Sequence, residues 1–263
     1  DAFLSDVVGS QGIQPDRRLW NEFAHLFPPG PMLEIGPGAG HFLAAAAEAN
    51  REVFAVEASA VHRDFLGANW GFRSVFGSLD ELPPTAPPFA AVAMFNTIEH
   101  VFDVAGLFES IRSRLAPRGV VLVTTCNAEC VVLPVVGTYW SMFKQPDHVS
   151  LPSGEGFRRL GRRTQLKCER VWTGELPLET PIGLAVAARD WILEHRRAET
   201  KPAMIPSHET PNESRAKDSP VPFQRRVVRG LMKATARVDP TRHLTALVGK
   251  AAGIRALFAR DSA

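Results

Sequence analysis

Short, mostly apolar runs alternate with helical patterns along the first two-thirds of the chain. The apolar runs that predict strands are residues 32–35, 53–56, 89–95 and 120–125. Continuous apolar runs of this length are typical of parallel strands that are covered on both faces. The stretches between them that predict helices are residues 40–50, 61–69 and 104–115. This alternation predicts an α/β fold with a doubly wound parallel sheet.

The two ends of the chain have different patterns. Residues 1–30 predict a helical lead-in whose apolar side chains pack on the core or cover a bound ligand, and Pro28-Pro29-Gly30 ends it. Near the other end, residues 201–220 are rich in Pro, Ser, Glu and Lys, which predicts a linker. The segments that predict helices around this linker are residues 184–197, 222–238 and 244–252.

Three closely spaced glycines follow the first predicted strand. Gly36, Gly38 and Gly40 form a turn that lets the backbone approach a ligand, because glycine has no Cβ. Glu57 ends the second predicted strand, where doubly wound folds hydrogen-bond the hydroxyls of a ribose. A glycine turn combined with an acidic strand end indicates a cofactor that contains a nucleoside; an ordinary turn is the simpler alternative.

The spacing of these glycines distinguishes between cofactors. Nicotinamide-binding turns have the spacing Gly-x-Gly-x-x-Gly, whereas the spacing here is Gly-x-Gly-x-Gly. A nicotinamide oxidoreductase is therefore a weaker alternative. With Glu34 two residues before Gly36, the segment resembles the first motif of class I S-adenosylmethionine-dependent methyltransferases. The resemblance implies that this turn wraps the methionine part of the cofactor and that Glu57 binds the ribose. The residues of the first motif implied to contact the cofactor are Glu34, Gly36, Pro37, Gly38 and Gly40.

The resemblance extends beyond the first motif. The strand at 89–95 is followed by Glu99-His100, and the segment Leu115 to Gly119 precedes a strand that ends near Asn127. This set, over residues 30–173, is similar to the subgroup that contains ubiquinone-biosynthesis O-methyltransferases and sugar and natural-product methyltransferases. It implies a Rossmann-like, seven-stranded, mostly parallel sheet with a helical lead-in and a C-terminal helical insertion.

The same resemblance implies domain boundaries and further cofactor contacts. Residues 31–173 form the cofactor-binding core, and residues 174–263 contain the insertion, the basic tail and a last strand at 255–260, antiparallel at the sheet edge. An acidic residue usually binds the adenine where this chain has Ser78, so we expect Ser78 and the backbone of Leu79 to replace it. Asn96 is expected to face the reactive end of the cofactor.

Two histidines are candidates for the base that a hydroxyl acceptor requires. A group that titrates near neutral pH suits this role. His100 directly follows Glu99, and both come after a predicted strand end, where the acceptor is expected to arrive. In the subgroup that this chain resembles, a histidine stands just before the next helix and the loop ahead of it lines the acceptor pocket, and His148 matches that position. Glu99 could polarise His100. The alternative is that both histidines only anchor their loops. The residues expected to line the acceptor pocket are Tyr139, Trp140 and Phe143.

We predict no metal site from the sequence. Quinone O-methyltransferases carry two acidic residues and a histidine that can hold Mg²⁺ in this region, but the first acidic position is Asn96 here. Mg²⁺ generally prefers carboxylates, so a site formed by Asn96, Glu99 and His100 is the weaker alternative.

Composition and charge restrict the partners. Residues 201–263 hold 12 Lys and Arg against 5 Asp and Glu, whereas the chain as a whole has a net charge of +2. The basic tail predicts a solvated helix or peripheral contact with an anionic membrane. Nucleic acid is a poor fit as a substrate, and we predict no nucleic-acid partner, because the loop after residue 95 lacks the Asn/Asp-Pro-Pro-aromatic tetrapeptide of adenine and cytosine amino methyltransferases. The three cysteines fit a reduced, cytoplasmic protein, and no run of 18 apolar residues or signal peptide occurs.

The predicted function is therefore transfer of a methyl group from S-adenosylmethionine to a small molecule. A hydroxyl of a sugar, quinone or natural product is the expected acceptor. The alternative is a non-catalytic scaffold or partner-binding protein of the same fold. No oligomeric state is predicted.

Overall fold

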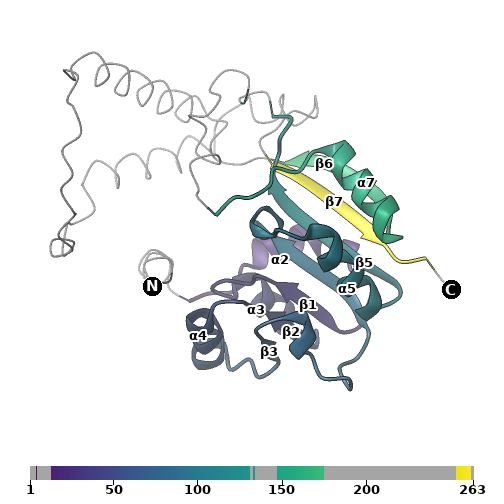
Figure 1. The fold of residues 1–263 in the computed structure, drawn as a ribbon. Coiled ribbons are helices and arrows are strands. Elements are labelled where there is room, and N and C mark those ends of the chain that lie inside the picture. The colour runs from purple at the N-terminus through teal and green to yellow at the C-terminus, as the bar shows by residue number, and fades with distance from the viewer. Residues whose placement is uncertain (1–3, 5–12, 131–132, 134–146, 175–252, 262–263) are drawn as a thin grey trace, which may run out of the picture. The chain divides into compact units, whose positions relative to one another are not determined.

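The computed structural model describes residues 4, 13–130, 133, 147–174 and 253–261 (Figure 1). The chain divides into two compact units, and the first comprises residues 1–128, 147–173 and 253–263. The sequence-based predictions that lie outside the described residues are the pocket residues Tyr139, Trp140 and Phe143, the three C-terminal helices and the linker at 201–220.

The first unit is built on one seven-stranded sheet with the order β3-β2-β1-β4-β5-β7-β6. The strands are β1 (Met32–Ile35), β2 (Val53–Val56), β3 (Val75–Phe76), β4 (Phe89–Phe95), β5 (Leu115–Cys126), β6 (Lys167–Gly174) and β7 (Gly253–Ala259). Strands β1 to β5 pair in parallel, and β7 runs antiparallel to β5. The predicted doubly wound α/β fold with a mostly parallel sheet is confirmed.

The helices follow the strands in the predicted order. The α-helices are α2 (Arg17–Phe23), α3 (His41–Glu48), α4 (Ala60–Trp70), α5 (Val104–Arg114) and α7 (Gly154–Thr164). Three 3₁₀ turns accompany them, η1 (Ala24–Leu26), η2 (Leu79–Glu81) and η3 (Ile98–His100). Ser153 is the N-cap of α7, because its hydroxyl accepts a hydrogen bond from the Gly156 N–H. Within the described part of the chain, no helix is long and apolar enough to cross a membrane.

Alternate residues of the central strands point to opposite faces of the sheet. On one face, Val92 of β4 packs in a cluster with side chains of α5 and α7, such as Phe108 and Phe157. On the other face, Ala93 packs in a cluster with Phe23 of α2 and Phe42 of α3. Figure 1 shows α5 and α7 on one side of the sheet and α2 and α3 on the other. Both faces of the sheet are therefore covered, which explains the continuous apolar runs.

The lead-in helix packs on the second of these clusters. Trp20 stacks on Phe27, with ring centroids 6.0 Å apart, and Phe23 is fully buried. The ring of Phe23 also lies 5.8 Å from that of Phe95, at the end of β4. The apolar residues that predict this helix are therefore part of the core.

The position of the last strand differs from the prediction. We expected it at the sheet edge, whereas β7 lies between β5 and β6, so that β6 forms the edge. Ile254, Ala256 and Phe258 of β7 join the cluster with α5 and α7, and Leu257 contacts the cluster on the other face. Apart from Arg255, which pairs with Glu22, the strand carries apolar side chains on both faces, and such a strand is better buried within the sheet than left at its edge.

The start of β5 also differs from the prediction. The sequence predicts a helix that ends at residue 115 and a strand that begins at residue 120, whereas the structure begins β5 at Leu115, which pairs with Phe89. The register then shifts between Phe89 and Ala91, and Arg118 has a positive φ of 61°. The Pro-Arg-Gly segment is therefore an irregularity inside a strand.

Candidate functional site

The glycine turn is held against the loop that follows β4. Gly36, Gly38 and Gly40 have φ values of 70°, 54° and 78°, which side chains rarely adopt. A Cβ on Gly36 would lie 2.6 Å from the Thr97 hydroxyl oxygen. That hydroxyl contacts the carbonyl oxygens of Ile35 and Phe95 at 3.2 and 3.1 Å. Position 36 therefore requires glycine for two reasons: the left-handed backbone conformation and the lack of space for a Cβ.

The Glu57 carboxylate lies beside this turn. Its Oε2 accepts a hydrogen bond from the Gly38 N–H at 3.2 Å, and its Oε1 accepts one from the Ser59 N–H at 2.9 Å. Glu57 is 8% exposed. Each carboxylate oxygen can accept a further hydrogen bond, so the group can still bind vicinal hydroxyls.

Glu34 is buried behind the glycine turn. Its Oε2 accepts no hydrogen bond from any described residue, and the residue is 3% exposed. Burial raises the pKa of its carboxyl group to about 8. A hydrogen bond from the Leu43 backbone opposes this shift, and the Glu57 charge adds to it. The surroundings of Glu34 therefore favour its neutral, protonated form.

The predicted adenine contact lies at the turn after β3. The Leu79 side chain packs in the core, so only its backbone can contact a ligand there. The Ser78 hydroxyl lies 3.5 Å from a carboxylate oxygen of Glu81, whose other oxygen accepts a hydrogen bond from the Gly77 N–H at 2.8 Å. Glu81 is an exposed carboxylate at this turn that no sequence motif identifies.

Glu99 connects three parts of the chain. The residue is 2% exposed, and its Oε2 accepts a hydrogen bond from the Thr125 hydroxyl at 2.8 Å. Its carbonyl oxygen accepts hydrogen bonds from the N–H groups of Val149 and Ser150, at 2.8 and 3.2 Å. These backbone bonds bring His148 next to the 3₁₀ turn η3, which carries His100.

The two predicted histidines are in contact. Their ring centroids are 4.8 Å apart with an interplanar angle of 71°. His100 Nδ1 lies 3.1 Å from the Asp147 carbonyl oxygen and 3.3 Å from its Oδ2. Since oxygen atoms of this kind accept, Nδ1 donates, and Nε2 of a neutral His100 remains available to take a proton. Asp147 was not identified from the sequence, because its backbone carbonyl makes the contact.

These groups gather at the carboxyl ends of neighbouring parallel strands. The Gly36 N–H donates to the Val56 carbonyl of β2, and the Asn96 N–H donates to the Thr124 carbonyl of β5, both at 2.8 Å. Asn96 is exposed and has a φ of 49°. Ligands of open α/β sheets bind at this edge. The structure therefore gathers here the strand ends that carry the glycine turn, Glu57 and Asn96.

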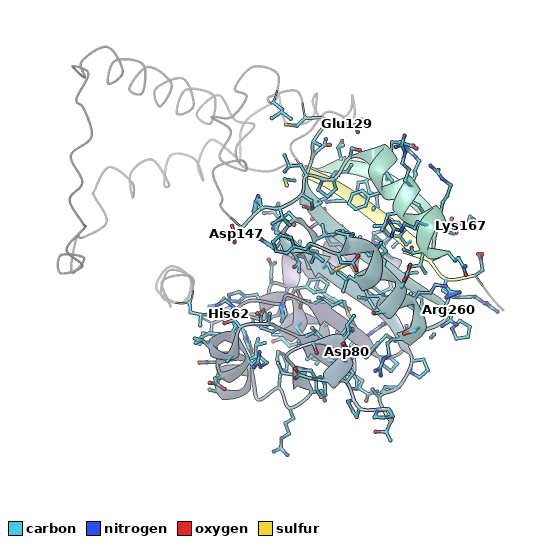
Figure 2. The ribbon with its side chains drawn as sticks, viewed as in Figure 1. His62, Asp80, Glu129, Asp147, Lys167 and Arg260 are labelled. Carbon is cyan, nitrogen blue, oxygen red and sulfur yellow. The ribbon has the colours of Figure 1, made fainter. Side chains whose placement is uncertain are left out.

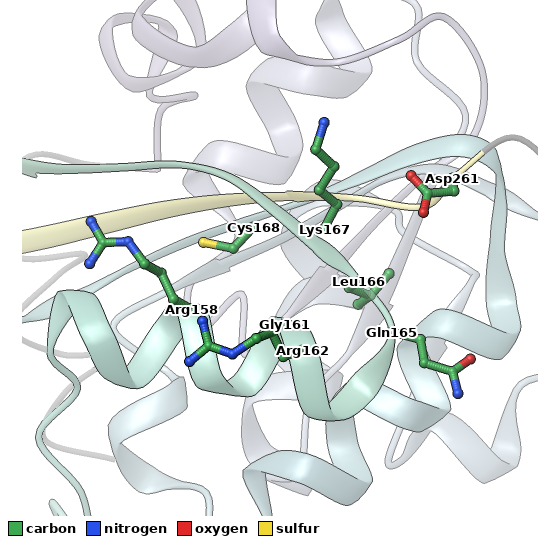
Figure 3. Close-up of a pocket in the computed structure, with 8 residues that line it drawn as sticks. All are labelled: Arg158, Gly161, Arg162, Gln165, Leu166, Lys167, Cys168 and Asp261. Carbon is green, nitrogen blue, oxygen red and sulfur yellow. The ribbon is translucent and has the colours of Figure 1, made fainter.

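An open pocket of about 430 Å³ lies at the opposite end of the strands (Figure 3). Its lining residues are Arg158, Gly161, Arg162, Gln165, Leu166, Lys167, Cys168 and Asp261. Asp261 follows β7, whose Ala259 pairs with Val120 near the start of β5. Figure 2 shows Asp147 at the opposite end of the strands from Lys167 and Arg260. This pocket is therefore separate from the candidate site.

Comparisons with known proteins agree with this description. Residues 14–171, more than half of the chain, match the family described as "Methyltransferase domain". A search of curated proteins found no match. Solved structures of similar fold include a SAM-dependent methyltransferase from Archaeoglobus fulgidus, with 15% identity, a TM-score of 0.58 and coverage of 99% of this chain and 100% of the other.

Two further structures have similar folds. A sarcosine dimethylglycine methyltransferase from Galdieria sulphuraria has 17% identity and a TM-score of 0.53, over 94% of this chain and 85% of the other. Phosphoethanolamine N-methyltransferase 2 from Haemonchus contortus has 16% identity and a TM-score of 0.57, over 98% of this chain and 56% of the other. At these identities the likeness concerns the fold.

Gly36→Ala is expected to destabilise the protein more than Gly71→Ala. Both glycines have a φ of 70°, so both substitutions incur the cost of a left-handed conformation, about 1–2 kcal/mol. Only Gly36 faces a clash, with Thr97, since nothing lies within 4 Å of a Cβ on Gly71. Urea unfolding of both variants measures the difference, and Thr97→Ala should recover part of the loss in the Gly36→Ala background. Equal losses at the two glycines would contradict this explanation.

Glu34→Gln is expected to remove a pH dependence of stability. With a folded-state pKa of about 8 and an ordinary value of 4.5, the folded protein binds more protons than the unfolded chain between these values. Stability should therefore fall as pH rises through this window, by at most about 1.4 kcal/mol per pH unit. Chemical denaturation between pH 5 and 8.5 tests this, with the exposed Glu52→Gln as control. If the free energy of unfolding of the wild type varies with pH in parallel with that of Glu34→Gln, Glu34 is already ionised throughout this pH range.

Proposed function

The chain belongs to the methyltransferase-domain family, and on this basis we propose that it transfers a methyl group from S-adenosylmethionine to a small molecule. The observation that carries the proposal is the bond between the Glu57 carboxylate and the Gly38 N–H. It joins the two features that a nucleoside cofactor requires, an open glycine turn and an acidic strand end. The fold shared with the Archaeoglobus protein, described as SAM dependent, supports the same cofactor.

In this proposal each part of the site has one role toward the cofactor. The backbone of Gly36, Pro37, Gly38 and Gly40 contacts the methionine part, and the buried Glu34 lies behind it. Glu57 accepts hydrogen bonds from the ribose hydroxyls, and the turn at Ser78 and Leu79 binds the adenine. Asn96 lies beside the reactive end.

The acceptor is proposed to be a hydroxyl group, and the paired histidines support this choice. S-adenosylmethionine supplies an activated methyl group, so the protein must position the acceptor and remove its proton. Nε2 of His100 can take that proton, because its Nδ1 is occupied by Asp147. The buried Glu99 carboxylate and His148 complete the surroundings of this ring. Tyr139, Trp140 and Phe143 are proposed to contact the acceptor.

A nitrogen acceptor is the second candidate. The Haemonchus structure, which shares the fold, is described as an N-methyltransferase. An amine becomes nucleophilic once it loses a single proton near its own pKa, so it depends less on an imidazole base than a hydroxyl does. The alternative of a non-catalytic scaffold remains an outcome of the binding experiment below.

We also propose where this reaction takes place. No disulfide joins the three cysteines, which suits a reducing, cytoplasmic setting. The basic tail would allow peripheral contact with an anionic membrane, and no role with nucleic acid is proposed.

In calorimetry, the protein is expected to bind S-adenosylmethionine and S-adenosylhomocysteine with micromolar affinity and not to bind NADH. Glu57→Gln should weaken both by about tenfold or more, since hydrogen bonds to a charged group are each worth about 1.5–3 kcal/mol. The exposed Glu109→Gln on α5 is the control and should bind like the wild type. Binding of NADH alone would overturn the cofactor assignment, and no binding of any of the three would favour a scaffold.

His100→Ala and His148→Ala should lower kcat with little change in cofactor affinity. Loss of a general base typically costs about 10²–10⁴-fold in rate. An acceptor panel of sugars, catechols, sarcosine and phosphoethanolamine, with labelled cofactor, first identifies the substrate class. His25→Ala, on the surface, is the control.

The variant His100→Asn separates catalysis from loop anchoring. Its side-chain amide can still donate to the Asp147 carbonyl, but it cannot accept a proton. Activity near the wild-type level in His100→Asn would show that His100 only anchors the loop.

A further inference from the structure

We propose that Glu99, His100 and His148 form a binding site for a divalent transition-metal ion of the zinc class. Each of these residues offers a ligand atom, and the three atoms lie within 4.8 Å of one another. The proposal goes beyond the methyl transfer proposed above and can be tested without any cofactor or acceptor.

The distances require only a small contraction of the cluster. Bonds of about 2.0–2.2 Å in a tetrahedral zinc site put neighbouring ligand atoms about 3.4 Å apart. The observed separations exceed this by about 1.4 Å or less, which side-chain rotation can remove. Both imidazoles lie in backbone segments that are already joined, since the Val149 and Ser150 N–H groups bind the Glu99 carbonyl.

Two of the three ligands are oriented by second partners, as in known metal sites. The Thr125 hydroxyl donates to Glu99 Oε2, which fixes the carboxylate. The Asp147 carbonyl accepts from His100 Nδ1, which fixes the ring and leaves Nε2 as the ligand atom. Such partners restrict the orientation of a ligand before the ion arrives and leave small rotations possible.

His148 provides the observation that a hydrogen-bond network alone does not explain. Its Nδ1 is buried, and in the described part of the chain it has no hydrogen-bond partner. A buried polar atom without a partner is rare and indicates a missing ligand, ion or water. A metal ion among these three residues would provide a partner for the His148 ring.

The types of donor indicate the class of metal. Two imidazoles and one carboxylate suit Zn²⁺, Fe²⁺, Co²⁺ or Ni²⁺, whereas Mg²⁺ prefers oxygen ligands alone. The set therefore differs from the Mg²⁺ alternative raised by the sequence, because the structure adds His148. The His100 side chain is 36% exposed, so a coordination position remains open to solvent or to an acceptor.

Metal binding would change the role of the histidines in catalysis. A ring nitrogen that ligates an ion cannot accept a proton, so His100 and His148 act as bases only in the metal-free protein. In the loaded protein the ion would lower the pKa of a hydroxyl bound at the open position, and the proton would pass to solvent.

The test is titration of the metal-free, tag-free full-length chain with Co²⁺, followed by displacement with Zn²⁺. We expect visible absorption bands that saturate at one ion per chain and disappear when Zn²⁺ is added. Glu99→Gln and His148→Ala should each weaken binding by about tenfold or more. His25→Ala removes an exposed histidine elsewhere and should bind like the wild type. Thermal unfolding shows whether each variant is folded. If Glu99→Gln does not fold, the metal affinity of His148→Ala decides the test.

Absence of saturable binding, or equal binding by the wild type and the folded variants, would overturn the proposal. Saturation by Mg²⁺ but not by Co²⁺ or Zn²⁺ would overturn the metal class. Calorimetry with S-adenosylhomocysteine on the same metal-free protein is independent of these results, so failure of the metal site is distinguishable from failure of the proposed methyl transfer.

Discussion

The close contact between Gly36 and Thr97 is the constraint on which the site depends. Gly36 has no side chain and a left-handed φ, so the Thr97 hydroxyl can reach the carbonyl oxygens at the ends of both β1 and β4. This contact fixes the glycine turn relative to η3, which carries Glu99 and His100. Any side chain at Gly36 would separate the cofactor turn from the residues proposed to act on the acceptor.

From Thr97 onward, backbone groups do most of the positioning. The Glu99 carbonyl binds two N–H groups of the segment that carries His148, and the Asp147 carbonyl binds the His100 ring. The buried Glu99 carboxylate is held by Thr125 on β5. Three segments far apart in sequence therefore meet at one edge of the sheet. Both functions proposed for this cluster, proton transfer and metal binding, require these three segments to be close together.

Much of this arrangement follows from local sequence patterns. Mostly apolar runs identify β1, β2 and β4, and the glycines with Glu57 mark the strand ends proposed to bind the cofactor, because these signals act over a few residues. The place of β7 inside the sheet depends on long-range packing of both its faces, which no local pattern specifies. The proximity of His148 to His100 depends on backbone hydrogen bonds, which leave no residue signature. Thr97 and Asp147 were missed for the same reason.

The most direct test of the account is a crystal structure of the protein with S-adenosylhomocysteine. We expect the ribose hydroxyls on the Glu57 carboxylate, the amino-acid part against the backbone of residues 36–40, and the sulfur directed toward the loop that follows β4. A ligand bound elsewhere, such as in the basic pocket of Arg158, Arg162 and Lys167, would contradict the account.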